Sequence, residues 1–326
     1  MTLGKVKIDE NFIINILLFS ILSLGVYLCF IGGYGSDEDT LPMIYVFEAK
    51  LNDGRFVTSR FTGNPVAEIG IGFLSHYLGS WAANLSTYLF LLFGLVFFYL
   101  TLAKKKDIKK LNFFMFLCLT NPILFFDNLE PVDYSWALIF FCAGLFFLNK
   151  KLFELSVLCF AFSIGVRINY VLFVLVAIMF CDFDFMISKI RRMILFITSF
   201  IVGGLFYLPI WFQSHFSLSW ITAARPTDQG VIGILSRFVY KSYISIGYIG
   251  FFIVIYFFFT NFSKIKKLKN FKFIIILGFA NLTIFLWIPA EFSYLQLFLV
   301  LLNFIIFKLD SKKLFYMICL TNLFSW

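Results

Sequence analysis

The sequence predicts an all-α polytopic membrane protein built as a bundle of about ten or eleven transmembrane helices. Of its 326 residues, 61% are hydrophobic and only 14% are charged. The mean hydropathy of +0.92 is above the range of soluble globular domains. Apolar stretches recur with lengths near the ~20 residues that cross a ~30 Å hydrocarbon core. No linker divides the chain, so we expect one domain over residues 1–326.

The basic residues predict how the chain is oriented. They gather in short links at 104–110, 150–151, 189–192, 264–272 and 308–313. Short lysine-rich links are typical of the cytoplasmic side of a membrane protein, so we assign the net charge of +9 to topology rather than to nucleic-acid binding. The N-terminus is then cytoplasmic, and the bias toward Phe, Ile and Lys suggests a bacterial inner (plasma) membrane.

The spans follow from these links in order. Residues 12–33 run outward as an uncleaved signal anchor and 82–103 return. Residues 111–126 and 134–149 form the next pair. Residues 152–181 begin and end beside basic links, so we expect two short helices with a turn near 165–167. Further spans are predicted at 193–211, 239–260, 272–288 and 293–307. The apolar tail, 314–326, is either a truncated span or an interfacial segment.

Four outer connections result, at 34–80, 127–133, 212–238 and 289–292. The first of these opens on Asp37-Glu38-Asp39, and ionisable groups beside a bilayer are functional candidates. Asp39 or Thr40 can cap a helix that ends at the 52–54 turn, with Pro42 in its first turn. A second amphipathic stretch follows residues 63–65. We expect both helices to lie on the outer membrane surface.

This loop resembles part of a known family. The residues concerned are Asp37-Glu38, the run Leu51-Asn52-Asp53-Gly54-Arg55-Phe56-Val57, and Arg60-Phe61-Thr62-Gly63-Asn64-Pro65 with Glu68. They resemble GT-C fold glycosyltransferases, above all the branch with lipid A aminoarabinose transferases and protein O-mannosyltransferases. In that branch an acidic pair opens the first periplasmic or lumenal loop, and two surface helices follow. The resemblance covers residues 25–100 well and the helix layout of 101–310 loosely.

The resemblance implies an inverting glycosyltransferase. Such enzymes take a sugar from a polyprenyl-phosphate carrier and pass it to a glycan, lipid or protein acceptor. An inverting transfer needs a carboxylate that takes the acceptor's proton, and positive charge that stabilises the departing phosphate. We predict Asp37 as this base, with Glu38 orienting the acceptor or supporting Asp37. The alternative is that both carboxylates are only a solvated loop edge beside a helix cap.

Further substrate-binding residues are predicted from the other outer connections. Asp133 matches the place of a family Asp, where it could hold sugar hydroxyls or pair with a cation, or else simply cap the helix that begins at Tyr134. Tyr294 starts a late span after a loop where the family carries a basic residue but this chain has Glu291, which shifts phosphate binding to other cations. Arginine suits phosphate because its planar fork donates two parallel hydrogen bonds. The outer-face cations are Arg55, Arg60, Arg167, Arg225, Arg237 and Lys241.

No cofactor is predicted, although Asp37, Glu38 and Glu68 could in principle hold a divalent cation. Two other functions stay open. An O-antigen or capsule polymerase usually has a large, late outer loop with several arginines, whereas the largest loop here is early and acidic. A transporter or lipid-linked sugar flippase would favour ionisable residues within spans or broken helices in two matching halves. Arg167, inside a long apolar stretch, is a mild point in favour of the flippase.

Overall fold

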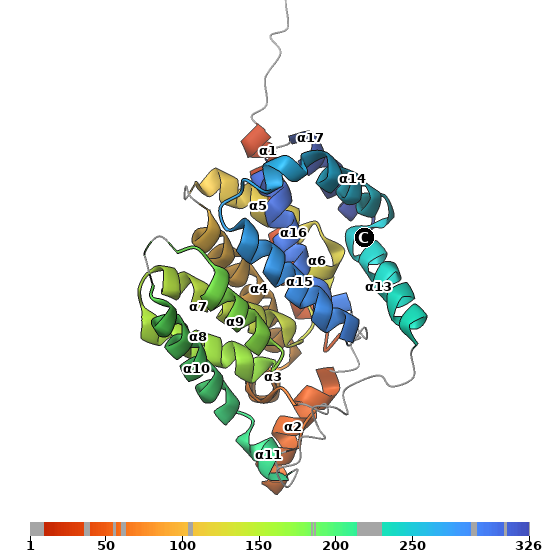
Figure 1. The fold of residues 1–326 in the computed structure, drawn as a ribbon. Helices are drawn as coiled ribbons and strands as arrows, with labels where there is room; N and C mark the ends of the chain where they lie inside the picture. The colour runs from red at the N-terminus through yellow and green to blue at the C-terminus, as the bar shows by residue number, and fades with distance from the viewer. Residues whose placement is uncertain are drawn as a thin grey trace, which may run out of the picture.

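The computed structural model describes residues 10–35, 40–54, 57–59, 63–103, 107–183, 185, 187–213, 230–287, 292–309 and 312–325. Throughout that part of the chain the regular elements are helices (Figure 1). By length and composition, α1 (Glu10–Ile31) and α4 (Ser80–Leu102) can each cross a membrane, and the bent pair α13 (Val231–Ile246) and α14 (Tyr248–Ile265) would make a third. The expected all-α membrane protein is confirmed at this level.

The remaining apolar helices are shorter than a simple crossing requires. They have 11 to 17 residues, against the ~20 that span a hydrocarbon core. The larger number of spans therefore stays a prediction. These helices are α7 (Tyr134–Asn149), α8 (Phe153–Val166), α9 (Tyr170–Phe180), α15 (Phe271–Trp287) and α16 (Gln296–Lys308), the last preceded by the 3₁₀ turn η1 (Phe292–Leu295).

Helix α7 packs between α4 and α8, and α10 (Lys189–Leu205) packs against α8 as well. Polar side chains join these helices at close range. The indole N–H of Trp136 donates to Thr87 Oγ1 across 3.1 Å, and Ser163 donates to the carbonyl of Ala137 across 3.0 Å. Such interhelical hydrogen bonds and small residues let helices pack closely where lipid gives no hydrophobic drive.

Several predicted elements are confirmed. The helix expected at 134–149 has those bounds, and 152–181 forms the helical hairpin α8–α9. The 34–80 connection holds two helices, α2 (Thr40–Asp53) and α3 (Pro65–Leu78), and Gly54 ends α2 with a positive φ of 63°. Met43 and Ile71 are buried where these helices pack together, whereas Tyr45 is exposed. Both predicted helices are therefore present and pack against each other, while their location on a membrane surface stays a prediction.

Three predicted spans are not continuous helices. Residues 111–126 divide into α5 (Ile108–Leu119) and α6 (Pro122–Phe126), because Pro122 lacks an N–H and Asn121 caps the new helix through Leu124 N–H. The span expected at 239–260 bends by 96° at Gly247, whose φ is 77°. Residues 193–211 end in a separate short helix, α11 (Leu208–Gln213), and the tail forms the 12-residue α17 (Lys312–Leu323).

The surface of the bundle carries large apolar side chains. On α1, Phe19 is 71% exposed, and on α14, Phe259 is 82% exposed. They belong to runs of exposed Phe, Ile, Leu and Tyr along the same helices. Extended apolar patches of this kind are rare on soluble monomers and fit a hydrocarbon environment.

The bundle has two chemically different ends. Figure 1 shows α5, the start of α1 and α17 gathered at one end, and α2, α3 and α11 at the opposite end. The first end carries Lys109, Lys308 and Lys312, and we call it the lysine end. At the other, α7 begins after the acidic 127–133 connection and packs near α3, so we call it the acidic end.

We predict opposite effects of two glycine-to-alanine substitutions inside helices. A Cβ at Gly144 would lie 2.6 Å from the Phe160 ring, whereas at Gly204 nothing lies within 4 Å. Gly144→Ala should therefore lower the unfolding temperature in detergent, because overpacking costs about 1–3 kcal/mol. Gly204→Ala should leave it unchanged or raise it, because alanine favours the helix. Equal responses of the two variants would contradict the close α7–α8 packing.

Candidate active site at the acidic end

A buried ion pair joins two segments of the acidic end. Arg167, which ends α8, places Nη1 2.7 Å from Asp133 Oδ1, and the two residues are 5% and 0% exposed. Asp133 therefore pairs with a cation, one of the three roles considered for it. The capping role is not observed, because Asp133 has a helix-like backbone and its side chain makes no cap hydrogen bond to α7. Charge-assisted bonds at this distance are strong, and a buried charge depends on its partner.

Two tyrosine rings enclose the guanidinium. Arg167 Cζ lies 3.8 Å from the centre of the Tyr134 ring and 4.7 Å from that of Tyr294. The two rings meet edge to face, with centroids 5.5 Å apart. A planar guanidinium stacks well on aromatic faces, so the cluster holds Arg167 in one orientation. It also joins the start of α7, the α8–α9 turn and η1, which are far apart in sequence.

Glu68 on α3 lies close enough to Asp133 for the two charges to interact, and it is fully buried. Its Oε1 accepts the N–H of Ser59 at 2.9 Å, the hydroxyl of Ser59 at 2.5 Å and the N–H of Asn64 at 3.1 Å. Burial raises the pKa of the Glu68 carboxyl, the hydrogen bonds from Ser59 and Asn64 oppose this, and the charge of Asp133 adds to the rise. The site thus contains a carboxyl group that holds its proton more tightly than an exposed glutamate does.

One oxygen of each carboxylate has no partner among the described residues. Glu68 Oε2 and Asp133 Oδ2 are both buried without a hydrogen bond there. Buried polar atoms in folded proteins are nearly always hydrogen-bonded, and an unsatisfied one calls for an explanation. These two oxygens can accept hydrogen bonds from hydroxyl or amine groups that enter the site.

The acidic connection 127–133 also meets the chain that leads to the predicted catalytic pair. Asp127 Oδ2 accepts the hydroxyl of Ser293 in η1 at 2.6 Å. A Cβ at Gly35 would lie 2.2 Å from Glu130 Cδ, so backbone and carboxyl group are in direct contact. Gly35 stands two residues before Asp37. Asp37 and Glu38 themselves lie outside the described residues.

The other predicted ligands fall into three groups. Lys241 on α13 is 9% exposed, and its Nζ lies 5.0 Å from the ring of Phe292, which belongs to the same 3₁₀ turn as Tyr294. Arg237 is exposed on the same helix. Outside the described residues lie Arg55, Arg60, Arg225 and Glu291. The structure therefore brings Glu68, Asp133, Arg167 and Tyr294 together, with Lys241 beside η1.

Sequence reasoning missed the residues that support this cluster. Ser59 holds Glu68, Tyr134 stacks on Arg167, and Glu130 contacts Gly35. A signal for the ion pair was present, since a charged residue between apolar helices requires a buried partner and Asp133 also begins an apolar helix. No comparable signal marked Ser59 or Glu130.

The described side chains form no metal-binding group, and the expectation of no cofactor stays a prediction. Among them, no three His, Cys, Asp or Glu residues are grouped so that they could hold a metal ion. Two of the three residues considered for a divalent cation, Asp37 and Glu38, fall outside that set. Chemically, the site offers carboxylate oxygens for hydroxyl protons and a guanidinium enclosed by aromatic rings. Comparisons with family models, curated proteins and solved structures found no match to this chain.

The Arg167–Asp133 pair should show strong coupling in a double-mutant cycle. Asp133→Asn or Arg167→Gln alone leaves one buried charge uncompensated, which should lower the free energy of unfolding by about 3–5 kcal/mol. The double variant removes both charges and should recover part of the unfolding temperature in detergent. Losses that simply add in the double variant would show that the two side chains do not stabilise each other.

Glu68→Gln should change how stability depends on pH. Because the folded pKa of Glu68 is raised from its usual 4.5, the stabilisation from its proton is complete below the unfolded pKa and is lost as pH rises through the folded pKa. Glutamine cannot titrate, so the unfolding temperature of the variant should rise relative to that of wild type as the pH increases above the usual pKa of 4.5. Glu48→Gln, on the neighbouring α2 with a side chain 47% exposed, is the control. A constant difference between Glu68→Gln and wild type would contradict the raised pKa.

Proposed function

We propose that this protein is an integral-membrane inverting glycosyltransferase. It moves a sugar from a polyprenyl-phosphate carrier to a cell-surface glycan or lipid acceptor. In this proposal the chain is a bundle of about ten or eleven spans in a bacterial inner membrane, with the lysine end in the cytoplasm and the acidic end outside. The observation that carries the proposal is the buried cluster of Glu68, Asp133 and Arg167 at the end where the chain leads into Asp37 and Glu38.

The residues have separate roles in the proposed reaction. The acceptor hydroxyl oxygen attacks C1 of the sugar, and the bond from C1 to the carrier phosphate breaks with its electron pair leaving on the phosphate. Asp37 takes the hydroxyl proton, and Glu38 orients the acceptor. Glu68 and Asp133 accept hydrogen bonds from sugar hydroxyls through the two oxygens that lack partners among the described residues. Arg167 acts by positioning Asp133, and Tyr294 by holding Arg167.

The departing phosphate needs a positive charge nearby. Arg167 does not supply it in our proposal, because its charge is paired with Asp133. In our proposal this charge comes from Lys241, with Arg60, Arg225 and Arg237. Lys241 is the best placed of the described cations, because it reaches Phe292 beside Tyr294. Since the donor is lipid-linked, it can enter this end of the bundle from the bilayer.

One observation favours a second candidate, a lipid-linked sugar flippase. The 96° bend between α13 and α14 resembles the broken helices that line transport pathways. A flippase would move the carrier across the membrane without breaking the bond from the sugar to the phosphate. The two functions therefore differ in the products that a purified protein forms.

The test is analysis of the host's surface polysaccharide by mass spectrometry. A deletion strain is complemented with wild type, Asp37→Asn or Glu48→Gln at equal membrane abundance. The deletion and Asp37→Asn strains should both lose the same sugar residue, because the acceptor's proton has no base. Glu48→Gln removes an exposed carboxylate of the same loop and should restore the glycan.

Two outcomes would contradict the proposal. Full restoration of the glycan by Asp37→Asn would show that this carboxylate is only part of a loop. A deletion that alters chain length, with each repeat unit intact, would indicate a polymerase. To separate a transferase from a flippase, the purified protein in detergent is incubated with a polyprenyl-phosphate sugar and with glycan and lipid acceptors extracted from the host. Release of free polyprenyl phosphate supports transfer and excludes a flippase alone.

A further inference from the structure

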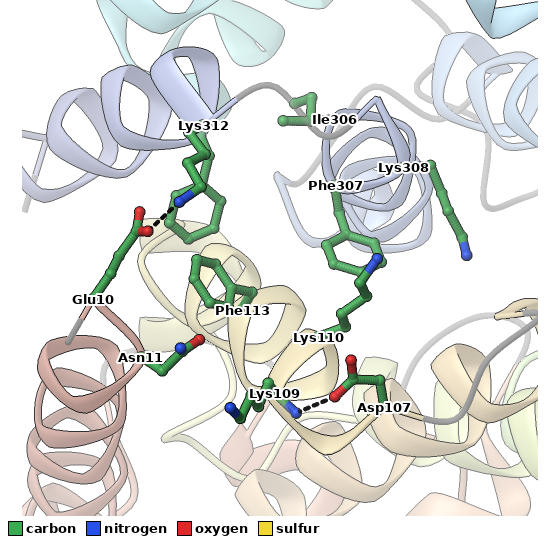
Figure 2. Close-up of a pocket in the computed structure, with 11 residues that line it drawn as sticks. Glu10, Asn11, Asp107, Lys109, Lys110, Phe113, Ile306, Phe307, Lys308 and Lys312 are labelled. Carbon is green, nitrogen blue, oxygen red and sulfur yellow. Dashed lines mark hydrogen bonds and ion pairs between the residues drawn. The ribbon is translucent and has the colours of Figure 1, made fainter.

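A second polar site lies at the lysine end, away from the cluster around Arg167. It is a cavity of about 360 Å³ between the starts of α1, α5 and α17 and the end of α16. A volume of this size is in the range of cavities that hold small ligands. Figure 2 shows Lys109 and Lys110 on one side of the opening and Lys312 across from them. Lys308 also belongs to the lining.

The charges of the lining favour an anion. Four lysines face two carboxylates, and each carboxylate already has a structural role. Glu10 pairs with Lys312 and accepts the hydroxyl of Tyr316, which joins α1 to α17. Asp107 accepts the N–H of Lys109 at 2.9 Å as the cap of α5. Lys109 and Lys110 are exposed at the opening, so their amines can reach an anion there.

The helix directions add to this preference. Three helices, α1, α5 and α17, begin at the cavity, and each has 12 residues or more. The N-terminal end of a helix carries partial positive charge and favours negatively charged groups. The effect reinforces the lysine side chains rather than replacing them.

The apolar part of the lining favours a lipid over a soluble anion. The rings of Phe113 and Phe315 lie 5.2 Å apart inside the cavity, and Phe307 lines it as well. Just outside, Phe12 and Ile13 of α1 are 60% and 44% exposed. A molecule with a phosphate at the lysines can therefore place hydrocarbon chains along α1.

We infer that this cavity binds the phosphate headgroup of an anionic phospholipid, such as phosphatidylglycerol, with its acyl chains along α1. Basic cavities between helices at the cytoplasmic side are suited to anionic headgroups. The bound lipid would join α1, α5, α16 and α17 at one point. This role does not require sugar transfer, so it can be tested apart from the proposed function.

The test uses the purified full-length chain in detergent with equimolar phosphatidylglycerol and phosphatidylethanolamine. Native mass spectrometry measures how much of each lipid stays bound. Wild type should retain phosphatidylglycerol preferentially. The double variant Lys109→Gln/Lys110→Gln should weaken this binding about tenfold or more, since each lysine near an anionic headgroup strengthens the attraction. Lys266→Gln/Lys267→Gln removes two lysines that do not line the cavity and should bind like wild type.

Three results would overturn the inference. Equal retention of the two lipids would show no anion preference. An equal loss in both double variants would assign the preference to general surface charge. Displacement of phosphatidylglycerol by millimolar inorganic phosphate or glycerol phosphate would identify a soluble anion as the ligand. Unfolding temperatures of the variants without added lipid, expected to match wild type, show that each binding loss is not a folding defect.

Discussion

The buried contact between Arg167 and Asp133 is the constraint on which the acidic end depends. A charge that leaves water must keep its partner, so the start of α7 and the α8–α9 turn are held at 2.7 Å. The enclosed guanidinium then fixes Tyr294 and with it η1. Asp127 accepts a hydrogen bond from Ser293 of η1. The charge of Asp133 also raises the pKa of the Glu68 carboxyl. One ion pair thus determines where four otherwise separate segments meet.

Much of the helix layout was predictable because hydrophobic length and basic links constrain it strongly. Residues 152–181 lie between two basic links, so they had to turn back, and they form α8 and α9. The breaks in the helices were harder to predict. Pro122 and Gly247 stand inside apolar runs, and composition alone does not distinguish a broken helix from a continuous one.

The sequence predicted which residues belong to the candidate site better than it predicted how those residues interact. Glu68, Asp133, Arg167 and Tyr294 were each predicted to bind substrate, and the structure places the four in one cluster, whereas their substrate-binding role stays a prediction. The prediction that Arg167 binds phosphate did not anticipate its ion pair, because pairing between residues 34 positions apart depends on how two helices cross. The cavity at the lysine end was missed for a related reason. In the sequence, each of these lysines fits a basic link at the end of a predicted span. Only the structure shows that four of them line one cavity.

The amide of Asn121 has a consequence for the order in which the protein is assembled. Its oxygen caps α6, and its Nδ2 donates at 2.8 Å to the carbonyl of Ser245, just before the bend at Gly247. A side chain at one helix break thus forms a hydrogen bond with a backbone carbonyl beside the other break, in an interior where unpaired polar groups are costly. Residue 245 leaves the ribosome 124 residues after residue 121. This contact between the two halves of the bundle can therefore form only after residue 245 has been synthesised.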